Sequence, residues 1–485
     1  MPKAILSLLA VVCSVPASAT SFIDILRMTA DHPSVASAQD IAGAALFDVD
    51  AEKASSNLQV SAGIGSVSYS GQPGYENNYI SPHVNLSKVL YDHGRNDAAV
   101  EGREAEFQAQ SMQVRAILES LNQQVLSLYS TAVTNARVVS VLDKEVAALQ
   151  DLLQRVQTIA TIDSGRASEV SQVSTRLSSV IASREASNTA MQQAWQQLRT
   201  LVNRPVTLTD GLPDLKKAGL LPATLDVAER ALKDNPSWIV TRYRRDSASS
   251  ALKVASKWNR PTWSVQLSLD SPRRNGEMEP FKAATLQVSS DLNLWDGGAG
   301  LASVKGQTRR LSSAEQDMEA TLRTLKAQLG QLWVSMPLRE QQIAALSQQS
   351  ASALQTWRAG ETQFFAGQRP LTDLISFATD YYSSLASYEE QRVQYLATQW
   401  QIVATLGKLG DLARNVQSLP ASALDGAGDM DSDGLGRPVP ATNNKAVEAF
   451  RQAVASGKTS SSTPLAAQTA ETQRRGEESL RAWPW

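Results

Sequence analysis

Four segments of the chain alternate apolar and polar residues. They lie at residues about 58–69, 79–91, 262–271 and 284–295. The pattern is cleanest in the second half, where Trp263, Val265 and Leu267 alternate with polar side chains. Because successive side chains of a β-strand point to opposite faces, this period predicts four strands that each have an apolar and a polar face.

Two much longer segments carry apolar residues at alternating steps of three and four. From Leu121 the apolar positions continue through Val125 and Leu128, and a similar spacing begins at Leu325 in the second half. This spacing predicts helices that pack side by side along their whole length. We place them at about 93–160 and 297–364. A helix over 93–160 has a length of roughly 100 Å at 1.5 Å per residue.

The two halves of the chain repeat the same order of elements. The junctions LYDHG (90–94) and LWDGG (294–298) each connect a predicted strand to a long helix. Upstream of them, ADHPS (30–34) corresponds to KDNPS (233–237), and helical sequence follows both. Matching elements at one offset indicate an internal repeat. The repeat predicts a first unit over residues 20–210 and a second unit over 211–413.

The two ends of the chain differ from the repeat. Residues 1–19 have a basic start, a short apolar segment and an A-x-A site at residues 17–19, which predicts a signal peptide. Cys13, the only cysteine, lies in this segment. It is a candidate lipid-attachment site, but the residues before it do not favour lipidation. Residues 414–485 are rich in Gly, Ala, Ser, Thr and Pro, which predicts a disordered, low-complexity tail.

Composition argues against enzymatic and nucleic-acid-binding functions. The 46 basic and 48 acidic residues almost balance, so the chain has no net field that would attract a polyanion. His32, His83 and His93 are scattered and form neither a triad pattern nor a metal-ligand spacing. The acidic run at 429–434 starts like a calcium loop, but Pro440 stands where the final glutamate is needed. We therefore expect no catalytic residues, no metal and no cofactor.

The predicted strands have the length and the flanking residues of membrane strands. Each is close to the nine to eleven residues, roughly, that a tilted strand needs to cross a bilayer. Aromatic residues at the strand ends suit the two membrane interfaces: Tyr69, Tyr91, Trp263 and Trp295. Four strands cannot close a barrel, and lipid does not tolerate open strand edges, so several chains must share one barrel. The alternative interpretation is a soluble sheet with one solvated face.

Residues 22–412 resemble the TolC-like outer-membrane channels. The most specific part is GQRPLTDLISFATDYYSSLASYEEQRVQYL (367–396), followed by TLGKL (405–409). The first half carries a shorter counterpart, GRASEVSQVSTRL (165–177). The resemblance implies a homotrimer with a 12-stranded β-barrel in the outer membrane, four strands per chain. A periplasmic barrel of coiled-coil helices continues from it.

The resemblance also implies a gate at the periplasmic helix turns. The matching positions are Arg369 and Asp373 in the second half and Ser168 and Glu169 in the first. Phe364 stands where the family has a gate tyrosine. A second departure is Ser376, which stands at the position of a second gate aspartate. Asp373 also has a purely structural interpretation, because an acidic residue in the first turn stabilises a helix N-terminus.

The implied function is that of an exit duct in a tripartite export system, not that of an enzyme. Its implied partners are outer-membrane lipid, a periplasmic adaptor (membrane fusion) protein and an inner-membrane ABC or RND transporter. We expect type I protein secretion, with efflux of drugs or other small molecules as the alternative. The rival from another class is a periplasmic coiled-coil scaffold that never enters a membrane. The expected location is the outer membrane of a Gram-negative cell, with the helices in the periplasm.

Overall fold

The computed structural model describes most of the repeat. The described residues are 21–68, 78–162, 166–206, 211–270, 273–274, 277–278 and 283–415. The predicted signal peptide, the C-terminal tail and Tyr69 lie outside them. The chain folds into two compact units. Among the described residues, those within 21–32, 118–228 and 329–415 form the helical unit, and those within 33–117 and 229–328 form the sheet unit.

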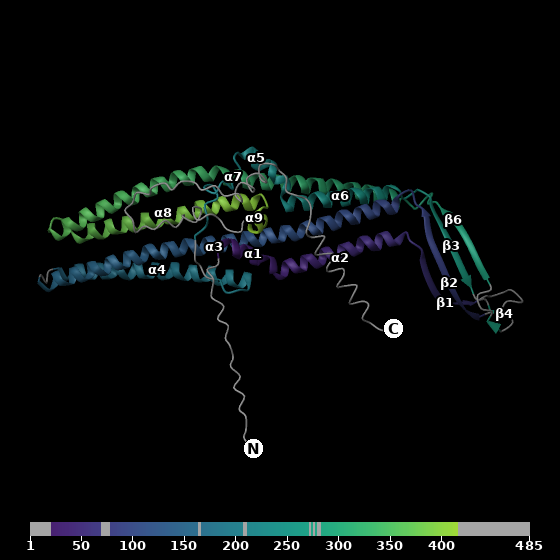
Figure 1. Cartoon of the computed structure of the whole chain (residues 1–485), viewed down its shortest axis with the longest axis horizontal. Helices are drawn as coiled ribbons and strands as arrows, with labels where there is room; N and C mark the ends of the chain where they lie inside the picture. Colours follow the sequence, from purple (N-terminus) through teal and green to yellow (C-terminus); the bar gives the residue numbers. More distant parts are fainter. Residues whose placement is uncertain are drawn as a thin grey trace, which may run out of the picture. The chain divides into compact units, whose positions relative to one another are not determined.

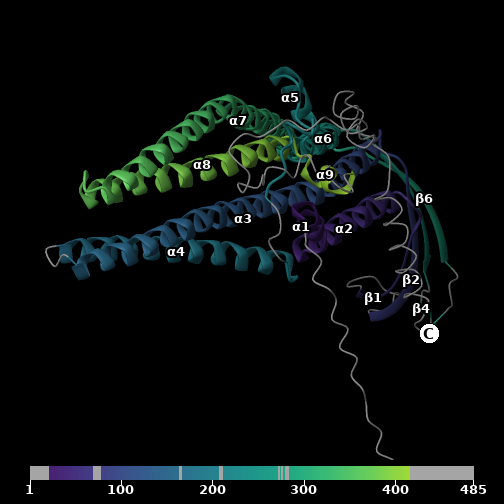
Figure 2. The same cartoon turned by 60° about the vertical axis from the view of Figure 1, so that its left-hand side comes forward.

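The helical unit contains two antiparallel helix pairs, α3 with α4 and α7 with α8, as both views show (Figures 1 and 2). It holds only the C-terminal parts of α3 and α7. Two short helices, α1 and α9, complete it. The bounds are α1 Phe22–Met28, α3 Arg95–Ile162, α4 Ala167–Val202, α7 Ala299–Phe365, α8 Leu371–Thr405 and α9 Leu409–Asn415.

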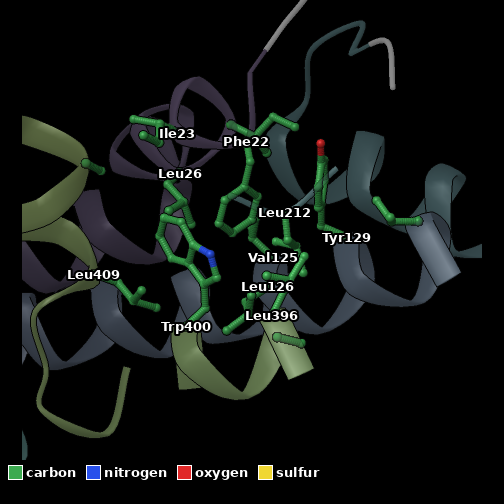
Figure 3. Close-up of a cluster of buried hydrophobic side chains, with 14 of the residues drawn as sticks. Phe22, Ile23, Leu26, Val125, Leu126, Tyr129, Leu212, Leu396, Trp400 and Leu409 are labelled. Carbon is green, nitrogen blue, oxygen red and sulfur yellow. The ribbon is translucent and has the colours of Figure 1, made fainter. Parts of the chain in front are cut away.

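An aromatic core ties α1 to the helix pairs (Figure 3). The ring of Phe22 lies 4.8 Å from that of Tyr129 on α3 and 4.8 Å from that of Trp400 on α8. The indole Nε1–H of Trp400 donates to the carbonyl of Pro213 at 2.9 Å, so its polar atom is satisfied. The carboxylate of Glu119 accepts from the backbone N–H groups of Leu409 and Gly410, at 3.0 and 2.7 Å, which holds the start of α9 on α3.

Part of α3 is long and apolar enough to cross a membrane, judged by length and composition alone. The structure shows where its apolar residues pack. Val125, Leu126 and Tyr129 are almost fully buried in the aromatic core of the helical unit. Contacts between helices thus account for part of its apolar character, since 33% of the apolar segment is buried.

The sheet unit contains one four-stranded antiparallel sheet in the order β1-β2-β3-β6. Helices α2 and α6 lead into it, and the N-terminal parts of α3 and α7 leave it. The bounds are α2 Pro33–Ser55, β1 Gln59–Ser68, β2 Asn78–Tyr91, α6 Pro236–Ser256, β3 Thr262–Asp270 and β6 Ala283–Asp291. Helix α5 (Leu225–Ala231) and the 3₁₀ turn Leu232–Asp234 precede α6. Two-residue strands, β4 (Arg273–Arg274) and β5 (Glu277–Met278), pair with each other between β3 and β6 in the sequence.

The strand register gathers the apolar side chains on one face. One row across the sheet, from β1 through β2 and β3 to β6, consists of Val60, Leu86, Leu267 and Leu286, each directly opposite the next. The next row on the other face is Gln59, Ser87, Gln266 and Gln287. The apolar face is uncovered within the chain, since Val60 is 63% exposed and Leu286 69% exposed.

The two strand-to-helix junctions are built alike. The side chain of Asp92 accepts from the backbone N–H groups of Gly94, Arg95 and Asn96. N–H groups at the start of a helix have no partner within the helix itself. Asp296 does the same for Gly298 and Gly300 at the start of α7. These contacts explain the recurring D-x-G sequence. The next two positions have positive φ in both junctions, as only small or turn-forming residues tolerate well: His93, Gly94, Gly297 and Gly298.

Strand β6 is shorter than the alternating pattern predicts. It ends at Asp291, whereas the pattern continues to Trp295. Leu294 and Trp295 are 81% and 78% exposed. By contrast, β2 continues to Tyr91 because β3 pairs with it up to Trp263. β6 lies at the sheet edge, and its outer side is unpaired in the described part of one chain.

The junction geometry generates a stability prediction. We expect Asp92→Ala to lower the free energy of unfolding by about 0.5–2 kcal/mol, because it removes the acceptor of the first N–H groups of α3. Asp92→Asn should lose much less, since an amide oxygen can still accept. Thermal unfolding followed by circular dichroism measures both. Equal melting temperatures for Asp92→Ala and the unmodified protein would show that the cap is dispensable.

Candidate functional site

The candidate gate residues lie at the helix ends of the helical unit, where each long helix turns back. A buried cluster, the turn cluster, joins α3 and α4 to α7 and α8 there. Its fully buried members are Leu149, Leu152, Val156, Val173, Val180, Phe364, Leu371 and Leu374. The C-terminal ends of both long helices therefore share one apolar core, and polar side chains surround it.

Phe364 belongs to this core and is only 1% exposed. The guanidinium of Arg166, which precedes α4, lies 5.1 Å from the ring centroid of Phe364, a cation–π distance. Neighbouring Phe365 is 39% exposed. The side chain of Phe364 thus anchors α7 within one chain instead of lining an opening.

Arg369 and Asp373 form a contact across the turn between α7 and α8. Their side chains are 3.4 Å apart, and both are a little under half exposed. Arg369 also donates from Nε to the side chain of Gln363 on α7, at 2.5 Å, and lies 5.6 Å from the ring of Phe377 on α8. Asp373 sits in the first turn of α8, where the helix dipole favours a negative charge. The arrangement brings together the two residues that the sequence singles out.

The first-half candidates lie at the start of α4. Ser168 is exposed, and Glu169 is partly buried in the first helical turn. A carboxylate oxygen of Glu169 lies 2.9 Å from the guanidinium of Arg166. Each turn therefore has an arginine and an acidic residue in contact, with spacings of three residues in the first half and four in the second.

Two further ion pairs near the turn cluster are absent from the sequence predictions. Arg155 on α3 lies 3.3 Å from Glu361 on α7 and 5.3 Å from the ring centroid of Phe365. It therefore connects the two helix pairs on the surface. Two exposed residues of opposite charge on different helices are not recognisable as a pair from a single sequence.

The second pair is Glu145 on α3 with Arg176 on α4, at 2.7 Å. The Glu145 side chain is only 4% exposed. Burial raises the pKa of Glu145, and the hydrogen bond from Arg176 opposes that shift. A glutamate between Leu142 and Leu149 in an otherwise apolar helix register was the available signal.

Ser376 lies in an open groove between α4 and α8. The groove encloses about 630 Å³, and Arg176 and Ser376 are among its lining residues. Most of the others carry hydroxyl or amide groups: Ser171, Gln172, Thr175, Ser179 and Thr372. At the position of Ser376, this chain therefore presents a hydroxyl in a groove that Arg176 also lines.

The interface aromatics lie in the sheet unit. Tyr91, Trp263 and Trp295 are all exposed, at 56%, 45% and 78%. Tyr91 and Trp263 are paired across β2 and β3, so they share one face at the helix-proximal end of the sheet. Their rings are exposed next to the apolar face of the sheet, and their place in an interfacial belt stays a prediction.

The side chains of these sites form ion pairs and hydrogen bonds within the chain. Within the described residues, no group of three or more His, Cys, Asp or Glu side chains is placed to hold a metal ion. The turns carry ion pairs on the surface of an apolar core. Exposed pairs of this kind contribute roughly 0–1 kcal/mol each, so other contacts readily replace them.

Comparison with known proteins places the fold. The family model described as outer membrane efflux protein matches residues 227–408. No curated protein sequence matches the chain. Among solved structures, CusC has a TM-score of 0.72 at 13% identity and covers 80% of this chain and 92% of its own.

Two further structures give the same result. VceC of Vibrio cholerae has a TM-score of 0.69 at 14% identity, over 80% of this chain and 96% of its own. CmeC of Campylobacter jejuni has a TM-score of 0.66 at 12% identity, over 84% of this chain and 93% of its own. The predicted fold class, mainly α with membrane β-strands, is the one that these outer-membrane proteins share.

The family match and the shared fold agree with the resemblance stated from the sequence. Both relate the chain to outer-membrane channels, which are transport proteins, and so confirm the expected location in the outer membrane. Residues 227–408 thus match the outer membrane efflux protein family, and the fold of the chain is that of the TolC-like outer-membrane channels.

Proposed function

We propose that this protein is the trimeric exit duct of a tripartite export system. The observation that carries the proposal is the sheet unit. Its four strands have an uncovered apolar face, a polar face and two open edges, and they lead directly into helices of 68 and 67 residues. A sheet with these properties suits a membrane barrel that several chains complete.

The apolar face supports contact with lipid. Ile64, Leu286 and Val288 are 77%, 69% and 60% exposed, and they come from both edge strands. Soluble proteins rarely leave such a continuous apolar surface uncovered. On the other face, the hydroxyls of Ser264 and Ser289 lie 3.0 Å apart, within hydrogen-bonding distance, as suits a water-filled lumen.

The trimer, the adaptor and the transporter are parts of this proposal. Twelve strands require three chains with four strands each. The adaptor and an inner-membrane ABC or RND transporter would supply cargo to the helical part. For the cargo we favour type I protein secretion, because the sequence before Cys13 does not favour lipidation. Efflux of small molecules is the second candidate, and the match to the outer membrane efflux protein family favours it.

We further propose that the helix turns close the periplasmic end. Phe364 anchors the core beneath the gate, while Arg369 and Asp373 in one turn and Ser168 and Glu169 in the other face the opening. Their contacts are partly exposed and are made to residues next to the same turns. An adaptor that offered new partners would open such a gate at small energetic cost.

The membrane assignment is tested by two neighbouring substitutions. Val288→Arg should prevent stable insertion, because a cation on the lipid face costs about 2–4 kcal/mol near the bilayer midplane. Ser289→Arg should insert normally, since its side chain points to the other face. The measurement is the amount of protein that stays in outer membranes after a high-salt wash. Release of the unmodified protein by the wash, or equal insertion of both variants, would favour the periplasmic scaffold.

The gate assignment is tested by conductance in planar bilayers. Three copies of Asp373 around the axis would favour cations, so Asp373→Ala should lower cation selectivity. Arg369→Ser should raise resting conductance, because it removes the contacts to Gln363 and Asp373. Asp380→Ala, farther along α8, is the matched control and should change neither. If Asp373→Ala lowers only the melting temperature, then Asp373 is a helix cap and the gate lies elsewhere.

A further inference from the structure

The internal repeat extends to individual contacts within the sheet unit. Ser55 at the end of α2 contacts Asn96 on α3, with a side-chain hydrogen bond of 2.8 Å. The counterparts are Trp258, 203 positions after Ser55, and Gly300, 204 positions after Asn96. A Cβ atom on Gly300 would lie 2.2 Å from the Trp258 ring, so these two residues also touch. Contacts in one half therefore identify the matching positions in the other.

In the first half, the start of α3 also packs against α6. Lys253 on α6 donates to the carboxylate of Glu101 on α3 at 2.7 Å, and this hydrogen bond lowers the pKa of Glu101. One residue further along α3, a Cβ atom on Gly102 would lie 3.4 Å from the Cβ of Ser250. Ser250 is only 2% exposed as a result. The two helices are thus in close contact.

In the second half, the start of α7 has no such neighbour among the described residues. The counterparts of Glu101 and Gly102 on α7 are Lys305 and Gly306, each 204 positions later, and both are exposed. Nothing described lies within 4 Å of a Cβ atom built on Gly306. By the repeat, the helix that should pack on the start of α7 as α6 packs on α3 is α2. The α2 of the same chain already packs beside α3. This leaves one face of α7 uncovered.

The outer face of α2 carries side chains that complement this face of α7. The counterparts of Ser250 and Lys253, 203 positions earlier, are Phe47 and Asp50. Phe47 is 62% exposed, and Asp50 is exposed as well. The counterpart of the ion pair between Lys253 and Glu101 is Asp50 with Lys305. Each helix carries the reverse charge, so the two side chains still attract each other. A large side chain at Phe47 would meet the open space over Gly306.

We propose that α2 of a second copy of this chain packs on the start of α7 as α6 packs on α3. Asp50 of one copy pairs with Lys305 of the next, and Phe47 covers Gly306. This inference rests on the proposed function, in which several chains share one barrel. It goes further by specifying which residues meet at each boundary between chains.

The same correspondence sets the strand register between copies. Within one chain, Lys88 on β2 pairs with Val265 on β3, and Tyr91 pairs with Trp263 after an irregularity. The same offsets of 204 and 203 positions transfer these pairs to the open edges. Leu292 and Trp295 of one copy then pair with Ala62 and Val60 of the next. β6 then continues past Asp291 once β1 of the next copy lies beside it. The exposed residues Leu294 and Trp295 become part of the pairing region.

A second copy is the occupant that best fits these observations. The unpaired face of α7, the exposed face of α2 and both open strand edges belong to one unit. They complement one another by the same geometry that, within one chain, packs α6 on α3 and pairs β3 with β2. One rotation of the same chain therefore covers all four surfaces, which is how closed symmetric assemblies form.

Disulfide cross-linking in intact outer membranes tests the proposal. In the variant with Phe47→Cys and Gly306→Cys, a close approach like that of Gly102 and Ser250 would place the two Cβ atoms within disulfide range. Oxidation should therefore link most chains into covalent trimers on non-reducing gels. The two single variants should stay monomeric in the denatured gel. The variant with Ile41→Cys and Gly306→Cys is the matched control, because Ile41 is also exposed on α2 but lies on another face.

A charge exchange provides an independent readout. Lys305→Asp should lower the temperature at which trimers dissociate in mild detergent, and adding Asp50→Lys should restore it. Failure of both experiments, with a trimer still captured by a general amine cross-linker, would overturn this packing but leave the proposed duct intact. If neither cysteine cross-links nor general cross-linked trimers form, both the packing and the proposed trimeric duct are wrong.

Discussion

The backbone of an edge strand in lipid needs a partner, and this constraint shapes the sheet unit. An unpaired N–H or C=O group costs several kcal/mol in hydrocarbon. A single favourable interaction elsewhere in the protein does not usually offset that cost. One chain has paired strands at β2 and β3 but open edges at β1 and β6. Its apolar face is also uncovered. A structure of this kind is complete only as part of a larger ring.

The helical unit meets a different requirement in the proposed gate, where its ends must hold together and still be able to separate. An apolar core at the turns, with Phe364 inside it, keeps each chain's helix pairs in contact. The charged contacts around that core are partly exposed and therefore weak. Strong packing within a chain and weak polar contacts at the rim would allow the proposed gate to open while the chain stays folded.

The sequence predicted the elements well but not how they end or pack. Alternation and 3-4 spacing are local, so the strands and long helices could be read directly, and Asp92 and Asp296 marked the junctions. The end of β6 at Asp291 depends on a neighbouring strand, which one sequence does not show. The burial of Phe364 and the pair of Glu145 with Arg176 depend on contacts between distant helices. For the same reason, the contacts of Phe364 were not foreseen, and the role of the expected gate residues stays a prediction.

Hydrogen exchange of backbone amides tests the central claim most directly. The measurement compares edge strands β1 and β6 with inner strands β2 and β3 in the protein reconstituted in lipid. If copies of the chain close the sheet, the edge-strand amides should be protected as strongly as those of the inner strands, and protection should extend past Asp291 towards Trp295. Rapid exchange along β1 and β6 beside protected β2 and β3 would contradict the account, because it would mean that the edges remain open.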